Sequence, residues 1–309
     1  MEKTIVIREA VTQKDVAMFW EQLRIYFKRD LFTDPKDEDR EYFLSDEYRA
    51  SIQKIHDRPR DRCRYLFFRR NGQDIGFAMP VIYTTEDGKC FLMEYCVYPQ
   101  FRGGGTGRKC AEVFLDWAQE NGALYAELNY GGNERRLRFW KSVGFVENGV
   151  DEWGEALMIL PPKDEVPISV EVLADPQDWQ LIKLENGFLK EIGEEAMTKE
   201  RTERLRQAVR DGRITFFVAK RGCRAVAMCS VAKCFSTFGC SDTGVFDDFY
   251  VEPAFRKKGI ARKLARAAQK WCRENKLASL TVCCASCDEE MYRALGFETR
   301  LGAVFAYLC

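Results

Sequence analysis

The stretch VYPQFRGGGTG, residues 97–107, places Arg102 and four glycines within six positions, directly after a strand-like start. Glycine loses more conformational freedom on folding than any other residue, so a dense cluster is useful mainly where φ must be positive or where a ligand must approach the backbone. A turn alone would account for two glycines more easily than for four. The stretch therefore raises the question of whether this loop holds a ligand.

The same pattern occurs a second time in the chain. The stretch VEPAFRKKGIA, residues 251–261, keeps the order Val-x-Pro, two residues, Arg, two residues, Gly, one residue, and then Gly or Ala. Arg256 lies 154 residues after Arg102, and Gly259 lies 154 residues after Gly105. A repeat in such a fixed register predicts two homologous domains.

The expected boundary between the two domains is a proline-rich stretch. LPPKDEVP, residues 160–167, holds three prolines and mixed charges between apolar runs, as interdomain linkers do. The length of 309 residues is about twice that of a usual domain. We therefore expect an N-terminal domain over residues 1–162 and a C-terminal domain over residues 163–309.

The charge balance argues against a nucleic-acid or membrane partner. Lys and Arg together number 48, as do Asp and Glu, so no net field attracts a polyanion. No segment approaches the roughly 18 apolar residues that a membrane span needs. The N-terminal MEKTIVIREA also lacks the apolar run of a signal peptide. We expect a cytoplasmic protein with neither partner.

The chain holds 13 cysteines and a single histidine. An odd number of cysteines without an export signal fits reduced, buried thiols better than a disulfide framework. Cys283, Cys284 and Cys287 invite a zinc site, but structural zinc usually needs four ligands. We expect buried strand cysteines here and no metal.

Apolar patterns predict the same order of elements in both halves. Asn71 and Gly72 between two strand-like runs are a strong hairpin signal. Hairpins followed by strand–loop–helix–strand units predict a mixed α/β sheet rather than a uniformly parallel one. The expected strands or hairpins are residues 4–10, 63–83, 90–98, 123–130, 156–160, 168–173, 214–232, 244–251, 279–284 and 304–308, and the expected helices are residues 13–27, 107–122, 133–144, 178–193, 200–212, 257–276 and 288–296.

A glycine-rich turn between a strand and a helix is typical of an anion site. Its successive N–H groups point to one place beside the positive end of the helix dipole, and phosphate suits that place best. The Walker A pattern needs Lys and then Ser or Thr after its last glycine, whereas Gly107 precedes Arg108, Lys109 and Cys110. The dinucleotide pattern G-x-G-x-x-G fails because Arg108 takes its last position. Neither nucleotide pattern fits.

Arg-x-x-Gly-x-Gly/Ala after Val-x-Pro resembles the acyl-CoA pyrophosphate loop of the GNAT superfamily of N-acetyltransferases. The resemblance covers nearly the whole chain, once in each half. NERRLRFWKSVGF, residues 133–145, and MYRALGF, residues 291–297, are similar to the family's Asn-x-x-Ala-x-x-Phe-Tyr-x-x-x-Gly-Phe block. The resemblance implies two tandem GNAT domains with a mixed α/β sheet. It rests on Val97, Pro99, Arg102, Gly105 and Gly107, and on Val251, Pro253, Arg256, Gly259 and Ala261.

What the family does implies acetyl-CoA as the acyl donor and no metal. The loop amides of the family bind the pyrophosphate, and the edge of the preceding strand pairs with the pantetheine arm. Basic residues near the loop either meet CoA phosphates or lie on a solvated helix face, and Asn133 either contacts the pantetheine region, caps a helix, or does both. The implied donor-binding residues are Tyr95, Cys96, Val97, Arg102, Gly103, Gly104, Gly105, Thr106, Gly107, Arg108 and Asn133 in the first half, and Phe249, Tyr250, Val251, Arg256, Lys257, Lys258, Gly259, Ile260, Ala261 and Arg262 in the second.

A carboxylate near each loop is the candidate general base. Glu94 and Asp248 lie three residues before Val97 and Val251, on the strand expected to line the cleft. Each either accepts the ammonium proton, binds the substrate cation, or faces solvent on the other side of the strand. Asp247 replaces Asp248 if the strand is turned by one residue.

Tyr292 occupies the position from which this family usually donates a proton to the leaving thiolate. The alternative is a packed helix tyrosine with an exposed hydroxyl. The equivalent residue of the first half is Trp140, whose indole N–H is too weak an acid for this role. The difference favours turnover in the second half.

Together these residues favour an acetyl-CoA-dependent N-acetyltransferase. It would move an acetyl group to a primary amine of a small molecule or peptide by direct transfer. The rival hypothesis is an acetyl-CoA-binding sensor in which one or both domains no longer catalyse. The acceptor is expected to be selected by residues 25–62 and 185–212, because these parts of the two halves do not repeat cleanly.

Overall fold

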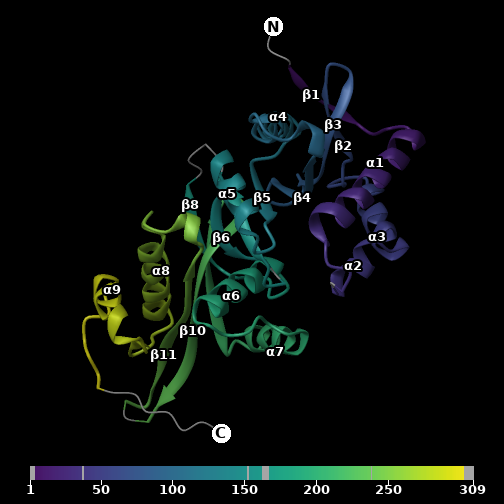
Figure 1. Ribbon diagram of the computed structural model, residues 1–309. Coiled ribbons are helices and arrows are strands. Elements are labelled where there is room, and N and C mark those ends of the chain that lie inside the picture. Colours follow the sequence, from purple (N-terminus) through teal and green to yellow (C-terminus); the bar gives the residue numbers. More distant parts are fainter. Residues whose placement is uncertain (1–3, 37, 152, 162–166, 238, 303–309) are drawn as a thin grey trace. The chain divides into compact units, whose positions relative to one another are not determined.

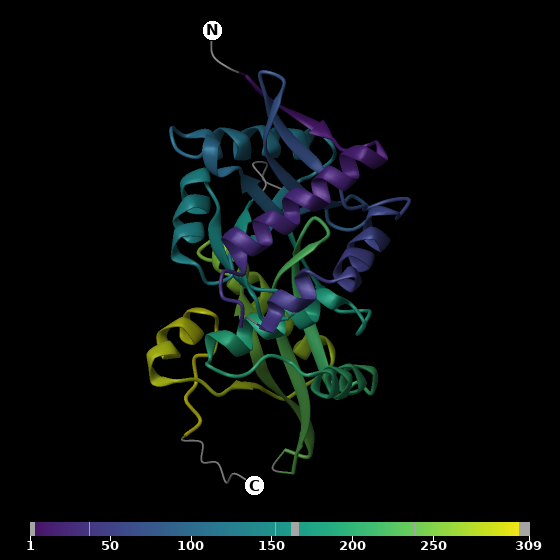
Figure 2. The same ribbon diagram turned by 45° about the vertical axis from the view of Figure 1, so that its right-hand side comes forward.

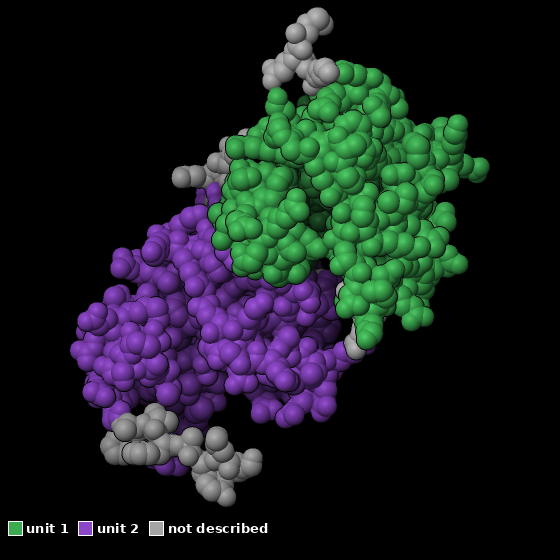
Figure 3. Space-filling model, viewed as in Figure 1, with its two compact units in different colours: residues 1–146, 157–163 green, residues 147–156, 164–309 purple. Residues whose placement is uncertain are grey.

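The computed structural model describes residues 4–36, 38–151, 153–161, 167–237 and 239–302. The chain divides into two units, residues 1–146 with 157–163 and residues 147–156 with 164–309 (Figure 3). The expected boundary near residue 163 and the strand expected over residues 304–308 lie outside the described residues. Each unit is built around a β-sheet of its own.

The sheet of the first unit is mixed, as predicted. Its strands follow the order β1-β2-β3-β4-β5-β7. Only β4 and β5 pair in parallel, and the other neighbours are antiparallel. The strands are β1 (Ile5–Glu9), β2 (Leu66–Arg70), β3 (Gln73–Tyr83), β4 (Lys89–Val97), β5 (Tyr125–Asn129) and β7 (Ala156–Leu160). A further strand, β6 (Val146–Val150), lies almost wholly among the residues of the second unit.

The predicted hairpin between β2 and β3 is present. Asn71 and Gly72 have φ values of 52° and 77°. Positive φ at both central residues is the requirement of the tight hairpin turn that matches the right-handed twist of the strands. The local sequence signal is therefore sufficient to fix this connection.

Helices cover both faces of the first sheet. Neighbouring residues of β2 point to opposite faces: Phe68 belongs to an apolar core with α4 and α5, and Phe67 to a second core with α1 and α3. Figure 2 shows α1 lying along the latter face. The helices are α1 (Gln13–Tyr26), α2 (Glu38–Phe43), α3 (Asp46–His56), α4 (Thr106–Glu120) and α5 (Glu134–Val143). No element had been predicted where α2 and α3 lie.

The second unit repeats this plan. Its sheet follows the order β12-β11-β10-β9-β8, and only β11 and β12 are parallel. The strands are β8 (Ile168–Val172), β9 (Ile214–Arg221), β10 (Arg224–Ser236), β11 (Ser241–Val251) and β12 (Leu280–Val282). Phe216 packs in a core with α6 (Trp179–Glu191) and α7 (Lys199–Arg210), whereas the neighbouring Phe217 contacts Trp271 of α8 (Ile260–Glu274) on the other face. Figure 1 shows α8 on one side of β10 and β11, and α6 and α7 on the other. A short helix, α9 (Glu289–Ala294), follows β12.

The cysteine cluster lies differently from the prediction. β12 ends at Val282, so Cys283, Cys284 and Cys287 follow the strand, and Cys283 and Cys287 are exposed. The expectation of buried strand cysteines is wrong, because the strand is shorter than its apolar pattern. Within the described parts of the chain, no three His, Cys, Asp or Glu residues are grouped so as to hold a metal ion.

The described helices are too short or too polar to cross a membrane.

Candidate functional site

In each unit the two parallel strands pair over only three residues. β4 pairs with β5 from Lys89 to Phe91, and β11 pairs with β12 from Gly244 to Phe246. Beyond these points β4 and β11 continue toward the glycine loops and stay paired with their antiparallel neighbours, β3 and β10. Each also carries a register shift against its antiparallel neighbour, which marks a β-bulge. Bulges increase local twist and re-aim side chains, and they are common beside active sites.

The two loops share left-handed backbone at two corresponding positions and differ at a third, because Gly104 has positive φ and Lys258 does not. Gly105 and Gly259 are the N-cap residues of α4 and α8, with φ values of 79° and 78°. Gly103 and Gly104 also have positive φ, and Lys257, which corresponds to Gly103, has a φ of 60°. An added Cβ would meet nothing within 4 Å at any of the three consecutive glycines of the first loop. The loop backbone is therefore open to a ligand.

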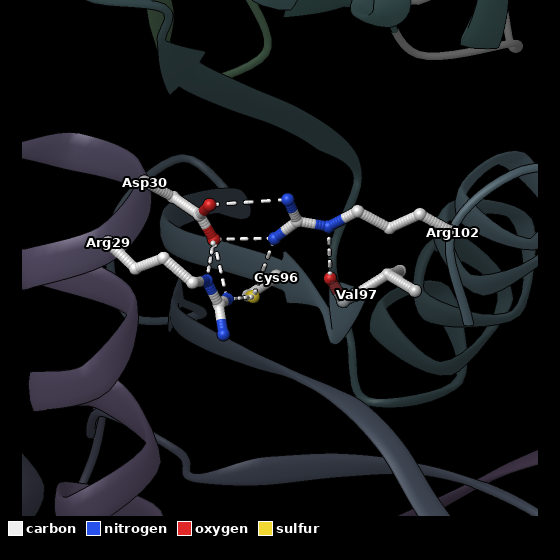
Figure 4. Close-up of polar contacts among 5 residues, drawn as sticks. All are labelled: Arg29, Asp30, Cys96, Val97 and Arg102. Carbon is white, nitrogen blue, oxygen red and sulfur yellow. Dashed lines mark hydrogen bonds and ion pairs between the residues drawn. The ribbon is translucent and has the colours of Figure 1, made fainter. Parts of the chain in front are cut away.

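The loop arginines fasten the loop to its surroundings. Arg102 Nε donates to the carbonyl of Val97 at 2.7 Å, and its two Nη atoms lie 2.5 and 3.2 Å from the Asp30 carboxylate (Figure 4). Asp30 lies on a π-helical turn, Phe27–Leu31, that continues α1. Arg256 repeats both contacts, with Val251 and with Glu191 of α6. The guanidinium groups thus hold the loop shape from within.

The first loop packs on its own strand. The Tyr95 hydroxyl donates to the carbonyl of Gly107 at 2.6 Å, and Thr106 is buried at the start of α4. Cys96 is buried on the opposite face, against α1. Arg108 pairs with Glu112 one turn further along α4, with both side chains exposed. In the first half, a ligand can therefore reach the backbone of the glycine loop, whereas Cys96 and Thr106 are buried.

Asn133 caps α5, as one of the two predicted roles requires. Its Oδ1 accepts the backbone N–H groups of Arg135 and Arg136 at 3.0 and 3.1 Å. A capping oxygen satisfies N–H groups that the first turn of a helix cannot pair.

The second loop exposes more charge. Lys257, Lys258 and Arg262 are exposed, and the ammonium of Lys258 lies 5.3 Å from the centre of the Phe255 ring. Ile260 is buried at the start of α8. On the preceding strand, Tyr250 is buried and packs in the core under α6, whereas Phe249 contacts Tyr292. Successive residues of β11 thus serve opposite faces of the sheet.

Asp248 points to the α6 face and Asp247 is exposed. Asp248 Oδ2 accepts a hydrogen bond of 2.6 Å from the Ser230 hydroxyl. Burial raises the pKa of Asp248, the Ser230 hydrogen bond opposes this shift, and the neighbouring Asp247 adds to it. A buried carboxyl with a raised pKa is suited to accept a proton near neutral pH.

A pocket of about 340 Å³ opens at Asp248. Two carboxyl groups and two guanidinium groups line it, together with an apolar wall. Glu185 of α6 is 5% exposed, and burial followed by the nearby Asp248 and Asp247 raises its pKa well above the ordinary value. The full lining is Glu185, Phe188, Leu189, Met197, Arg201, Arg204, Leu205 and Asp248. Two acids that share one buried site compete for ionisation, which is typical of functional sites.

Tyr292 stands on the other face of β11. Its ring contacts those of Phe246, Phe249 and Phe297, with centroids 5.9 to 6.4 Å apart. Burial raises the pKa of Tyr292 to about 12, so the phenol keeps its proton at neutral pH. The tyrosine is thus packed and protonated, on the face of β11 opposite to Asp248, and its raised pKa makes it a weaker acid than an exposed phenol.

The corresponding residues of the first unit differ. Glu94 is buried among α1 and α3 side chains, and burial raises its pKa to about 8 against the opposing effects of Arg136 and Tyr26. Trp140 is buried in the core, where it contacts Tyr95 and Phe145. A pocket of about 280 Å³ in this unit is lined by Met18, Gln22, Arg29, Asp74, Tyr98, Pro99 and Gln100, and thus not by Glu94.

A buried charged cluster lies at the start of the second loop, around Glu252. Glu252 binds Lys183 at 2.8 Å and Arg224 at 3.0 Å, and all three side chains are almost fully buried. Asn148 of β6 donates to Glu252 at 3.1 Å, and its Oδ1 accepts the N–H of Ala254 at 3.2 Å. These contacts fix the chain just before the loop begins.

Sequence reasoning missed several residues of this site. It placed the acceptor region at residues 185–212 but did not single out Glu185, Arg201 or Arg204, which meet only when α6 and α7 fold over β11. A signal for Glu185 was present: it stands in the apolar stretch LIKLENGF, where a carboxylate on the buried face of a helix needs a reason.

Part of the chain is similar to solved acetyltransferase structures. The chain resembles a glucosamine-6-phosphate N-acetyltransferase from Arabidopsis thaliana (17% identity, TM-score 0.40, 46% of this chain and 99% of the other). It also resembles an aminoglycoside acetyltransferase from an uncultured soil metagenomic sample, solved with trehalose (20%, 0.41, 46% and 95%). A third is an acetyltransferase with acetyl-CoA from Clostridium acetobutylicum (15%, 0.40, 46% and 96%). No curated protein sequence matches the chain.

The family comparison covers both halves. A model of the acetyltransferase (GNAT) family matches residues 20–145 and again residues 179–297, and each match includes one of the two glycine loops. Because the matches extend over more than half of the sequence, the chain belongs to the acetyltransferase (GNAT) family and carries two GNAT regions.

Proposed function

We propose that the second unit transfers an acetyl group from acetyl-CoA to a primary amine of a small molecule. The observation that carries the proposal is the pocket of about 340 Å³ that both Asp248 and Glu185 line. Asp248 is on β11, the strand that leads into the second loop. Its volume suits a small-molecule acceptor. The free thiols of the described cysteines fit a reducing, cytoplasmic setting.

The second loop fits the pyrophosphate of the acyl donor. Gly259 is left-handed, its added Cβ would meet nothing within 4 Å, and it begins the 15-residue helix α8. Helix N-termini favour phosphate because their N–H groups are unpaired and the helix dipole is positive there. Lys257, Lys258 and Arg262 supply positive charge around this point. We keep these residues, with those of the first loop, as the proposed donor site.

The proposed step is a direct transfer. The amine nitrogen forms a bond to the acetyl carbon, and the carbon–sulfur bond of the thioester breaks. Asp248 accepts the proton that the ammonium loses, because a carboxyl with a raised pKa is a stronger base than an exposed one. Tyr292 gives its proton to the departing sulfur.

The test uses the full chain with acetyl-CoA and a pool of primary amines, and it measures the release of free thiol. We expect release with wild type, and a loss of at least about tenfold in kcat for Tyr292→Phe and for Asp248→Asn. Phenylalanine retains the ring contacts of Tyr292, so the unfolding midpoint should not change. Undiminished turnover of the phenylalanine variant across the pH range would remove the acid role.

The rival function is an acetyl-CoA sensor. It predicts that acetyl-CoA binds, as calorimetry would show, while no amine pool releases thiol. For the first unit we propose donor binding without turnover, since Trp140 replaces the tyrosine and Glu94 is buried away from the pocket of that unit. Titration of the Asp248→Asn variant should then show one acetyl-CoA bound per unit, and binding to the second unit alone would contradict it.

A further inference from the structure

The pocket of the second unit carries charge of both signs. α7 bears four arginines, and two of them are neutralised on the helix itself: Arg206 and Arg210 pair with Glu203. Arg201 and Arg204 line the pocket instead. In the parts of the chain that the structure describes, neither of these two guanidinium groups has a carboxylate partner. Both side chains are exposed; Arg201 donates to the backbone carbonyl of Glu195 at 3.3 Å, and its positive charge opposes the rise in the pKa of Glu185.

Glu185 offers the pocket an unsatisfied acceptor. Glu185 Oε1 is buried and has no hydrogen-bond partner among the described residues, although the side chain is 95% removed from solvent. A buried polar atom without a partner is destabilising, and a bound ligand, ion or water in the pocket would supply the missing hydrogen bond. Glu185 and Asp248 together form an acidic wall of the pocket.

The rest of the pocket lining is apolar. Phe188, Leu189, Met197 and Leu205 complete the lining. Asn186 accepts the backbone N–H of Met197 at 2.8 Å, which ties the segment before α7 to α6. An occupant thus meets acidic, apolar and basic side chains within one pocket.

We propose that the acceptor is a small amine that also carries a carboxylate or phosphate group. Its ammonium binds Glu185 and Asp248, and its anionic group binds Arg201 and Arg204. A short apolar spacer between the two groups contacts the apolar lining of the pocket. The planar fork of arginine donors matches both kinds of anion. A neutral amine would leave the arginines unpaired, and an anion without an amine would leave Glu185 unsatisfied. This inference rests on the proposed function, because it specifies the acceptor of the same site.

The test compares matched pairs of ligands by calorimetric binding to the full chain. γ-Aminobutyrate is compared with butylamine, and phosphoethanolamine with ethanolamine. We expect the anionic member of at least one pair to bind at least about tenfold more tightly, the size of one charge-assisted hydrogen bond. The pair with the larger ratio identifies carboxylate or phosphate. Equal binding within both pairs overturns the proposal.

Variants locate the effect. The double variant Arg201→Gln/Arg204→Gln should lose the preference for the anionic member, whereas Arg210→Gln, on the same helix but paired with Glu203, should keep it. Glu185→Gln should weaken both members of a pair, because it removes an acceptor of the ammonium. A preference that survives in the double variant contradicts the assignment.

Thiol release with the same ligands separates this inference from the proposed function. If the anionic ligands bind more tightly but no thiol is released, the proposed acceptor class is supported and the proposed acetyl transfer is contradicted. Thiol release that is equally fast with neutral amines supports the transferase and contradicts the pocket.

Discussion

Asp248 owes its orientation to a bulge and not to simple alternation along β11. Phe246 and Phe249 both contact Tyr292 on one face, whereas Asp248 and Tyr250 face α6. Strict alternation would place Phe246 and Asp248 on the same face. The left-handed backbone of Asp248, with a φ of 49°, absorbs the extra residue, and Asp tolerates this region better than most side chains.

The hydrogen bond from Ser230 tunes Asp248, and this can be tested through pH. Since the hydrogen bond lowers the pKa and Asp247 raises it, removing each should move the acidic limb of kcat/KM in opposite directions. Ser230→Ala should shift the limb to higher pH by about one unit, and Asp247→Asn should shift it to lower pH. Full pH profiles of both variants measure this. Shifts of the same sign, or none, would argue against Asp248 as the base.

Glu94 should make the stability of the first unit depend on pH. Its pKa is about 8 in the folded chain against an ordinary 4.5, so the folded state holds a proton that the unfolded state releases. Stability is therefore greatest below pH 4.5 with respect to this group and falls by a few kcal/mol as pH rises toward 8. Urea unfolding of wild type and Glu94→Gln at pH 5 and 8 measures the difference.

The glutamine variant stays uncharged, so it should lose much less stability over this interval. Glu112→Gln is the control, because Glu112 is exposed beside Arg108. If Glu94→Gln shows the same pH slope as wild type, the buried carboxyl is ionised in the folded chain after all.

At the scale of the element, the second loop keeps a left-handed residue without a glycine. Lys257 has a φ of 60°, which disfavours a side chain by roughly 1–2 kcal/mol, whereas Lys258 is not in this region. Lys257→Gly should therefore raise the free energy of unfolding by up to about 1 kcal/mol after the entropy of glycine is counted. Lys258→Gly should lower it by a similar amount. Denaturant unfolding without acetyl-CoA measures both, and equal effects would contradict the backbone explanation.

The sequence predicted those elements whose cause is local. The hairpin at Asn71–Gly72, the two mixed sheets and the helices that begin after Gly105 and Gly259 all follow from turn chemistry and apolar periodicity. The repeat adds information that one loop alone does not hold. Lys257 keeps the left-handed backbone of Gly103, so this backbone shape does not require a glycine.

What the sequence did not predict depends on contacts between distant elements. Arg201 and Arg204 share their helix with Arg206 and Arg210, and no local pattern distinguishes the two pairs. Only the packing of α7 beside α6 and β11 brings Arg201 and Arg204 to the pocket. The same holds for the exposed Cys283 and Cys287, because the end of β12 depends on its short pairing with β11.

At the scale of the whole molecule, the two units do not follow the repeat in the sequence. Residues 147–156 precede the proline-rich stretch, yet they belong to the second unit. Asn148 explains part of this, because its amide joins the buried Glu252 to the N–H of Ala254. Glu252 forms ion pairs with Lys183 and Arg224, and the asparagine adds a further hydrogen bond to this buried carboxylate. Unpaired polar groups in a buried cluster are destabilising, so the segment that holds Asn148 stays with the second unit.

Asn148→Ala should therefore destabilise the second unit, although the residue lies in the first half of the sequence. It removes one hydrogen bond to a buried carboxylate and one to a backbone N–H, together worth about 2–4 kcal/mol. Hydrogen exchange of the full chain should rise in peptides from residues 224–260, and the KM for acetyl-CoA should increase because the chain before the loop loosens. Val146→Ala, which is exposed on the same strand, should change neither. Exchange that rises only within residues 4–146 would contradict the assignment of this segment to the second unit.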